Sequence, residues 1–202
     1  GETEMRLPRR LVLYRTSNWT VLPTEHQEQI EKLAQRLATM FAEYREQDAS
    51  PALEALTAHQ QTVHAGELAS VLGWLATQHG ALVSDAFKEF VTEGKGYVGS
   101  ILDAAIRAIR VARDRANEYV PPDEVWLTPS VTSVAPLIEM GTGDPLFCRQ
   151  WTALGVPCLS VPLLYESATG LPYGPQLVMS SGEDQRLLEV ARAMMELMGE
   201  GE

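Results

Sequence analysis

The chain of 202 residues has few of the residues that disulfide frameworks, metal sites and membrane spans require. It contains two cysteines, Cys148 and Cys158, and its four histidines are scattered along the sequence. A zinc-type site needs several such ligands close together, so we predict no metal site and no cofactor. No apolar run approaches the roughly 20 residues that cross a membrane, so no membrane association is predicted.

Positive charge is also scarce, with 16 lysines and arginines against 27 acidic residues and a net charge of −11. Such a surface repels a phosphate backbone, which argues against nucleic acid as a partner. The start Gly1-Glu2-Thr3 does not resemble a signal peptide, and a first residue other than methionine indicates a trimmed tag or an excised segment. With its two thiols expected to be reduced, the chain is predicted to be cytoplasmic.

The first 120 residues read mainly as helices after one strand at Arg9–Arg15. A helix is expected from Thr24, with Thr24 as its N-cap and Gln27 at the capping-box position. Its apolar stripe repeats at three and four residues through Ile30, Leu33, Leu37 and Phe41. Further helices are predicted over 51–78, 84–91 and 97–119, so the helical region covers about 24–119.

Short buried strands are predicted later in the chain, at 125–128, 157–164 and 173–179. The strand 157–164 is expected to be central and covered on both faces, with Cys158 and Ser160 on one side and Leu159 and Val161 on the other. One or two helical turns over 146–154 and a closing helix over about 184–199 complete the pattern. The fold class predicted is α/β, a mixed β-sheet covered by helices, forming a single lobe over 1–202 with its sheet and pocket wall at about 125–180.

Four motifs in the second half occur in a fixed order. They are Trp126-Leu127-Thr128-Pro129-Ser130, Thr142-Gly143-Asp144-Pro145, Trp151-Thr152-Ala153-Leu154-Gly155-Val156-Pro157 and Gly170-Leu171-Pro172-Tyr173-Gly174-Pro175-Gln176-Leu177. Together they resemble the C-terminal half of the amidase signature family of hydrolases. In that family the last motif commonly reads Gly-Leu-Gln, whereas this chain has Pro175, which should lie at a bulge or away from a ladder partner.

The resemblance implies serine acyl transfer on a carbon–nitrogen amide bond, by a serine–serine–lysine triad within a Gly/Ser-rich stretch. The chain has no such stretch and no Gly-Gly pair, and none of its three lysines, Lys32, Lys88 and Lys95, matches the catalytic position. No catalytic residue is therefore assigned. The chain is expected to supply the scaffold and pocket wall of an amidase-type hydrolase and to be inactive alone. The alternative is a non-catalytic scaffold that binds a small molecule or complements a partner.

The resemblance implies that the loop and helix around 144–151 border the acyl pocket, so Asp144, Phe147, Cys148 and Trp151 are the candidate substrate-binding residues. Phe147 and Trp151 have core packing as an equal alternative, and Asp144 is favoured as a helix cap. Cys148 is more typical of a buried thiol than of a nucleophile. The partner expected is a small-molecule amide, provided that the missing half completes the pocket. Strands left unpaired near Leu11–Tyr14 or Leu177 also predict homo-oligomers.

Overall fold

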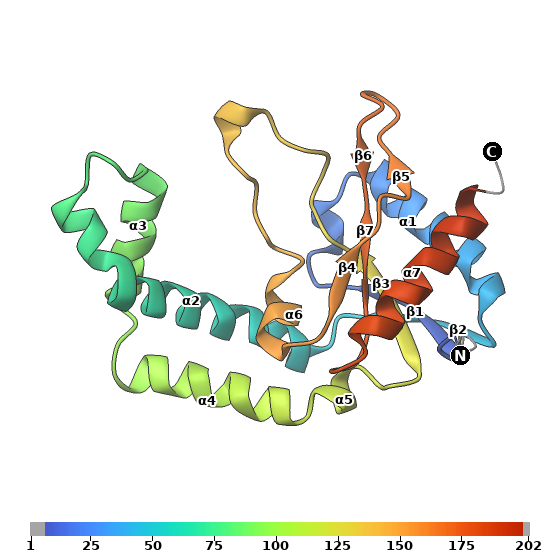
Figure 1. The fold of residues 1–202 in the computed structure, drawn as a ribbon, viewed down its shortest axis with the longest axis horizontal. Helices are drawn as coiled ribbons and strands as arrows, with labels where there is room; N and C mark the ends of the chain where they lie inside the picture. Colours follow the sequence, from blue (N-terminus) through green and yellow to red (C-terminus); the bar gives the residue numbers. More distant parts are fainter. Residues whose placement is uncertain (1–6, 200–202) are drawn as a thin grey trace.

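The computed structural model describes residues 7–199 and has a mixed sheet with helices on both faces (Figure 1). Five strands form the sheet in the order β2-β1-β3-β7-β4, and two others pair as a separate hairpin. The sheet strands are β1 (Arg10–Arg15), β2 (Glu43–Asp48), β3 (Glu124–Pro129), β4 (Cys158–Ser160) and β7 (Pro175–Val178), and the hairpin consists of β5 (Leu164–Tyr165) and β6 (Pro172–Tyr173). The predicted α/β class is confirmed.

The helices are α1 (Thr24–Leu37), α2 (Pro51–Gln78), α3 (Asp85–Gly94), α4 (Ser100–Asp114), α5 (Ala116–Tyr119), α6 (Arg149–Leu154) and α7 (Asp184–Gly199). Short 3-10 turns lie at Trp19–Val21, Ala38–Met40 and Ile138–Met140. Within the described residues, no helix is both long enough and apolar enough to traverse a bilayer.

β1 is parallel to both of its neighbours, whereas β7 is antiparallel to β3 and β4. Pro129 of β3 lies opposite Pro175 of β7, at the end of their ladder. Neither proline has an N–H to donate, so the two are paired where the ladder stops and no donor is lost from its middle. The expectation that Pro175 lies at a bulge or away from a ladder partner is therefore wrong, because Pro175 is paired in register with Pro129.

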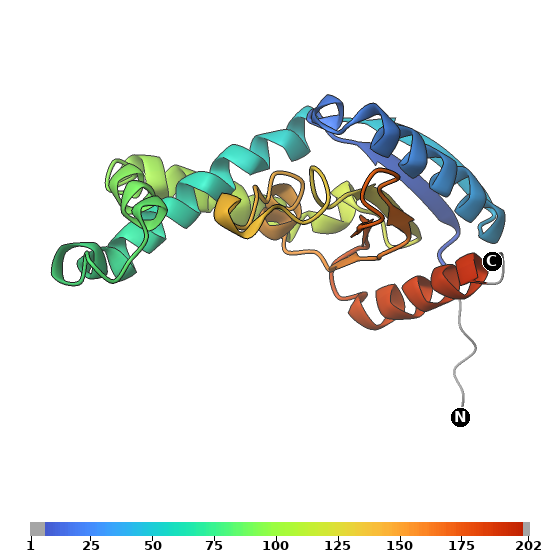
Figure 2. The same cartoon turned by 90° about the horizontal axis from the view of Figure 1, so that it is seen from above.

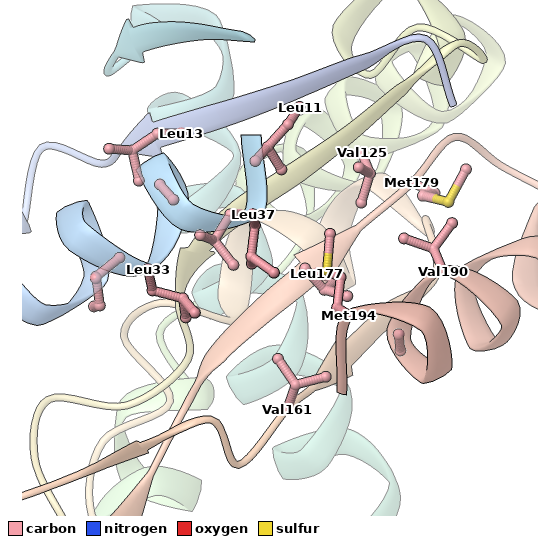
Figure 3. Close-up of a cluster of buried hydrophobic side chains, with 14 of the residues drawn as sticks. Leu11, Leu13, Leu33, Leu37, Val125, Val161, Leu177, Met179, Val190 and Met194 are labelled. Carbon is pink, nitrogen blue, oxygen red and sulfur yellow. The ribbon is translucent and has the colours of Figure 1, made fainter. Parts of the chain in front are cut away.

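One face of the sheet is covered by α1 and α7 (Figure 3). Leu33 and Leu37 of α1 and Val190 and Met194 of α7 pack with strand residues that include Leu177. The helix spacing predicted the α1 stripe, because residues three and four apart share a face. This layer holds the sheet on the side away from α2, α4 and α6.

The opposite face is packed by α2, α4 and α6 around three aromatic rings. The ring centroid of Tyr14 lies 5.0 Å from that of Trp126 and 5.6 Å from that of Trp151, in tilted and edge-to-face arrangements. These are the geometries that aromatic quadrupoles favour. The three rings join β1, β3 and α6 into one core and fix the position of α6 on the sheet.

Helices α2, α3 and α4 form an arm whose far end projects from the sheet, as both ribbon views show (Figure 2). α3 packs closely on α2 at Gly94, where a β-carbon would come within 2.0 Å of the carbonyl oxygen of Ala65. Ser84 caps α3 by accepting a 3.2 Å hydrogen bond from the Phe87 N–H. The arm therefore depends on one close backbone approach and a conventional cap.

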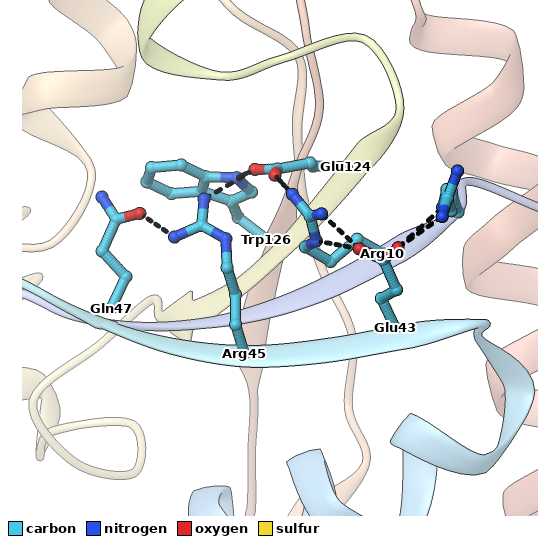
Figure 4. A network of polar contacts seen from close by, with 7 residues as sticks. Arg10, Glu43, Arg45, Gln47, Glu124 and Trp126 are labelled. Atoms are coloured by element: carbon cyan, nitrogen blue, oxygen red, sulfur yellow. Dashed lines mark hydrogen bonds and ion pairs between the residues drawn. The ribbon is translucent and has the colours of Figure 1, made fainter.

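Strand β2 was not predicted, because its sequence Glu-Tyr-Arg-Glu-Gln-Asp is almost entirely polar. Its charges are paired across the sheet (Figure 4). Glu43 accepts hydrogen bonds from Arg10 and from Arg9, Arg45 donates to Glu124 at 2.9 Å, and Arg15 donates to Glu46 at 2.8 Å. Cross-strand ion pairs thus replace apolar packing on this edge strand, and a charged edge resists pairing with another chain.

Three helix predictions were wrong in detail. The helix expected over 97–119 is broken into α4 and α5 at Arg115. α1 stops at Leu37 and leaves Phe41 outside it, because the chain turns through Ala38–Met40 into β2. Thr24 lies inside α1, whose N-cap is Pro23 without a side-chain bond, and Gln27 instead donates to the Leu22 carbonyl at 2.8 Å.

The strand predicted at 157–164 is also different from the expectation. β4 covers only Cys158–Ser160 and lies at the edge of the described sheet, and Cys158 and Ser160 are exposed. Val161 is 2% exposed and packs in the α1/α7 core as expected. The segment is therefore covered on one face, because α7 packs on the side of Val161 while the other side faces out. Gly155 ends α6 in the left-handed region at φ 72°, as the turn required.

Candidate functional site

A cavity of about 600 Å³ lies beside the end of β3, where the loop after Pro129 faces the β5–β6 hairpin. Four segments line it: the loop 130–136, the turn 142–144, residues 160 and 162 of the chain leaving β4, and 172–174 of the closing motif. Three of the four sequence motifs that carry the family resemblance therefore contribute to one cavity. The size is in the range of small-molecule sites.

Close to the cavity in sequence, the side chain of Gln176 on β7 is buried. Its Nε2 donates to the Pro129 carbonyl at 2.8 Å and to the Phe147 carbonyl at 2.9 Å. Both donors of this amide are therefore used to join the end of β3 to the segment before α6. Because buried polar groups that satisfy one another fix a local arrangement, Gln176 holds the end of β3, next to the lining residue Ser130, against the segment before α6.

Two hydroxyl groups meet at the inner end of the cavity. The Oγ of Ser130 lies 3.2 Å from the Oγ of Ser160 and also donates to the Gly174 carbonyl. The thiol of Cys148 donates to the Ser130 carbonyl at 3.4 Å, and burial raises the pKa of this thiol. Such hydroxyl groups can bind a polar substrate atom, but no lysine or histidine among the described lining residues activates them.

The hairpin side of the cavity is formed by Tyr173, whose ring stacks on His26 of α1 at a centroid distance of 3.9 Å. The Tyr173 hydroxyl donates to Gln29, and burial raises the pKa of Tyr173. Glu25 of α1 accepts a 3.1 Å hydrogen bond from the Ser167 N–H in the hairpin turn. α1 therefore holds the β5–β6 hairpin, and with it this wall, against the sheet.

The structure brings only part of the predicted set to this cavity. Asp144 lines it, is exposed and pairs with Arg149 at 2.8 Å. Its favoured role as a helix cap is wrong, because the N-cap of α6 is Cys148 and no side chain caps this helix. Phe147 and Trp151 are each 1% exposed and lie in the two cores, which agrees with the packing alternative. Cys148 is half-buried beneath Ser130.

Sequence reasoning did not assign Ser130, Ser160, Tyr173 or Gln176 to a site; the hydroxyl group of Ser130 was set aside because serine and threonine are common in ordinary loops. All four lie in or next to the motifs, and the signal that marks them is their position at strand ends that meet at one edge. Their meeting depends on the β3–β7–β4 pairing, which sequence spacing alone did not supply.

Metal chemistry finds no support in the geometry of residues 7–199, which bring together no group of three or more side chains that could hold an ion. Lys32 and Lys88 form surface pairs with Glu28 and Asp85 at 3.4 and 2.7 Å. These lysines belong to helix surfaces, away from the residues that line the cavity.

Sequence comparison finds relatives over part of the chain only. No family model matches it. The curated proteins named "Putative amidase AmiC", from Mycobacterium tuberculosis and Mycobacterium bovis, are 29% identical over 107 residues. This match covers 47% of the chain and 22% of each relative, so the chain spans well under half of their length.

Solved structures match almost the whole chain. A crystal structure of an amidase has a TM-score of 0.77 at 21% identity, covering 95% of this chain and 46% of the other. A bacterial aryl acylamidase of the amidase signature family has a TM-score of 0.67 at 17% identity, covering 95% of this chain and 44% of the other. The resemblance predicted from the four motifs is thus confirmed, and the chain has the fold of the amidase signature enzymes over about half the length of such a chain.

Proposed function

We propose that this chain provides one wall of the substrate pocket of a hydrolase that acts on carbon–nitrogen amide bonds by serine acyl transfer. The observation that carries the proposal is the cavity at which the Ser130 and Ser160 hydroxyl groups meet, and to which three of the four sequence motifs contribute lining residues. It supplies hydrogen-bonding groups without an activated nucleophile. The chain then binds and orients a substrate, and the reacting serine and its lysine belong to a complementary part of the enzyme.

The lining supports an apolar substrate with one polar group. Val131, Val134 and Ala135 come from the loop after β3, and Pro162 and Pro172 from the opposite side. Apolar walls with few polar groups are typical of small-molecule pockets, in which the polar groups fix orientation. The substrate class proposed is therefore an amide with an aliphatic or aryl acyl group. Asp144 at the rim is proposed to meet a polar part of it.

The test measures ammonia release from a panel of aliphatic and aryl amides. The purified chain is expected to show no turnover, because no lysine or histidine is among the described lining residues to remove a proton from Ser130. Ser130→Ala and Ser160→Ala serve as matched variants. Turnover by the chain that either substitution abolishes would place the nucleophile here and overturn the proposal.

Binding is measured separately, by the change in melting temperature with the same amides. We expect a rise with butyramide or a larger aliphatic amide that is lost in a variant with a filled cavity, Ala135→Trp. No rise with any member of the panel would count against a pocket-wall role.

A second candidate is a scaffold that complements a partner, and the β4 edge favours it. β4 pairs only with β7 on its described side and carries no charged residue, unlike β2 at the other edge. An uncharged edge strand offers its backbone groups to another strand. Light scattering tests whether the β4 edge pairs with a second copy of the chain. A monomer at high concentration would count against such pairing. Dimers that are dissociated by the substitution Cys158→Lys would support it.

A further inference from the structure

Most of α2 and the turn that follows it carry almost no charge. Within residues 55–84, Glu67 is the single aspartate, glutamate, lysine or arginine, although 21% of the whole chain is charged. Apolar side chains are also spread around α2 and do not gather on one side. A helix of this kind is normally covered on every side. The part of α2 that solvent reaches is therefore a candidate contact surface.

One side of α2 is already covered by the rest of the arm. A β-carbon on Gly66 would lie 3.1 Å from the Tyr97 carbonyl oxygen, and one on Gly73 would lie 3.5 Å from the Val91 side chain of α3. At 3.6 residues per turn, Val71 is turned about 140° from Gly66 and about 160° from Gly73. Val71 therefore lies on the side of the helix opposite to these contacts.

That opposite side carries exposed apolar side chains. Val71 is 66% exposed and Leu72 is 39% exposed. Both line a surface hollow of about 270 Å³, together with His64, Glu67 and Leu68. The apolar residues recur at intervals of three and four, which is the spacing with which one helix packs on another. We call the side defined by Leu68, Val71, Leu72 and Leu75 the outer face of α2.

We propose that the outer face of α2 pairs with the same face of a second copy of this chain, antiparallel and about a two-fold axis near Val71. Two chains of net charge −11 repel each other over most of their surfaces, and the repulsion is weakest where the surface is uncharged. Among the residues that line the hollow, a basic partner would find one carboxylate, that of Glu67, and an acidic partner no lysine or arginine. The charge distribution therefore favours a second copy over a charged partner. Such pairing does not depend on the substrate pocket.

The position of Glu67 favours the antiparallel arrangement. If Val71 lies at the axis, the two copies of Glu67 are eight residue positions apart, or about 12 Å along the helices at 1.5 Å per residue. This separation exceeds the Debye length of about 8 Å at physiological salt, so the two carboxylates are largely screened from each other. Parallel pairing in register would instead place them side by side. Because the arm projects from the sheet, antiparallel pairing also places the two sheets at opposite ends of the paired arms (Figure 2).

Light scattering on the full chain between about 10 and 500 µM tests the pairing, since this range suits interfaces smaller than the standard size. The mass should rise from 22.3 kDa toward twice that value. Val71→Glu should keep the chain monomeric over the same range, because it brings two like charges together at the axis. Val111→Glu is the matched control: Val111 is 58% exposed on α4, outside the outer face of α2, and this variant should dimerise as the unaltered chain does. Both variants should keep the melting temperature of the unaltered monomer, because both sites are exposed.

Three further variants separate this pairing from its alternatives. Leu72→Glu should act as Val71→Glu does, and it remains informative if Val71→Glu fails to fold. Cys158→Lys should leave the dimer intact, because β4 lies outside the paired faces. Glu67→Gln should change the dissociation constant by less than about threefold, whereas side-by-side carboxylates in a parallel pair predict a clear strengthening.

A monomer at every concentration overturns the proposal. So does a dimer that survives both Val71→Glu and Leu72→Glu, or one that Cys158→Lys dissociates. A mass that grows beyond two chains contradicts it as well, because a two-fold contact is closed. Strengthening by Glu67→Gln of about tenfold or more would exclude the antiparallel arrangement.

Discussion

A β-carbon on Gly174 would lie 2.0 Å from the carbonyl oxygen of Val161. Real side chains do not approach a backbone oxygen so closely, so the segment after β4 and the start of β7 fit together only with glycine at this position. The same glycine offers its own carbonyl to Ser130. One close backbone approach therefore sets both the width of the cavity and the place of its hydroxyl group.

Gly174→Ala is accordingly expected to push the two segments apart. Overpacking of this kind costs roughly 1–3 kcal/mol of unfolding free energy, measurable by urea denaturation. Amide-induced stabilisation should be lost as well, because the Ser130–Ser160 contact widens. Gly199→Ala, where a β-carbon meets nothing within 4 Å, is the control and should be nearly neutral. Equal stability of the two variants would contradict the close fit.

Gln176→Leu is expected to weaken the connection between the end of β3 and the segment before α6, while roughly preserving side-chain volume. The substitution leaves the carbonyl groups of Pro129 and Phe147 without the donors that now reach them at 2.8 and 2.9 Å. Unpaired buried carbonyl groups cost about 1–3 kcal/mol. Gln185→Leu on the exposed face of α7 removes only a 3.2 Å contact to Glu189 and should change the unfolding free energy little. If both substitutions lowered the unfolding free energy by a similar amount, the Gln176 hydrogen bonds would not be what joins the end of β3 to the segment before α6.

Glu124 should make the stability depend on pH. Burial alone would raise its pKa, but hydrogen bonds from Trp126, Arg45 and Arg10 outweigh it and lower the pKa. A carboxyl group whose folded-state pKa is lowered contributes stability above its unfolded value, about 4.3, and loses it as pH falls through the folded value.

Glu124→Gln should therefore destabilise the protein at pH 7 by about 2 kcal/mol, the usual loss for hydrogen bonds to charged groups. The difference from the unaltered chain should shrink as the pH is lowered below about 4, because the unaltered chain loses the same contribution there. Denaturant curves at several pH values measure it, with the exposed Glu196→Gln as control. If the difference in unfolding free energy between the variant and the unaltered chain did not change with pH, the ionised Glu124 carboxylate would not be its source.

The sequence was sufficient where turn-forming residues bounded a helix or where a short apolar run formed a strand. The interval 51–78 was predicted with the bounds of α2, and the apolar runs gave β1 and the fully buried β3. The ordered motifs identified the fold because their intervals survive at low overall identity. They also pointed to the region of the cavity, since strand ends carry the loops that line it.

The sequence was insufficient where partners are distant. The local sequence of β2 does not mark it as a strand, because its charges are paired with residues that are distant in sequence. Glu43 pairs with Arg10, which is 33 residues earlier, and Arg45 pairs with Glu124, which is 79 residues later. Whether the side chains of Phe147 and Trp151 face the cavity or the core likewise depends on which side of the chain around α6 packs against the sheet. The network of Gln176 required the β3–β7 register, and no local pattern supplies a register between strands so far apart in sequence.

The one-sided burial of the chain around β4 is tested by Val161→Asp. Val161 is 2% exposed and packs among the side chains of the α1/α7 core (Figure 3). An unpaired charge there costs several kcal/mol, comparable to the whole stability of a marginal domain. We expect an insoluble or unfolded protein, seen as loss of the cooperative thermal transition. Val98→Asp is the matched control, because Val98 is 64% exposed and its substitution should leave the melting temperature nearly unchanged. If the Val161→Asp protein folded and had the same melting temperature as the Val98→Asp control, this segment would lie on the surface. The sheet order in which β4 leads into the core would then be excluded.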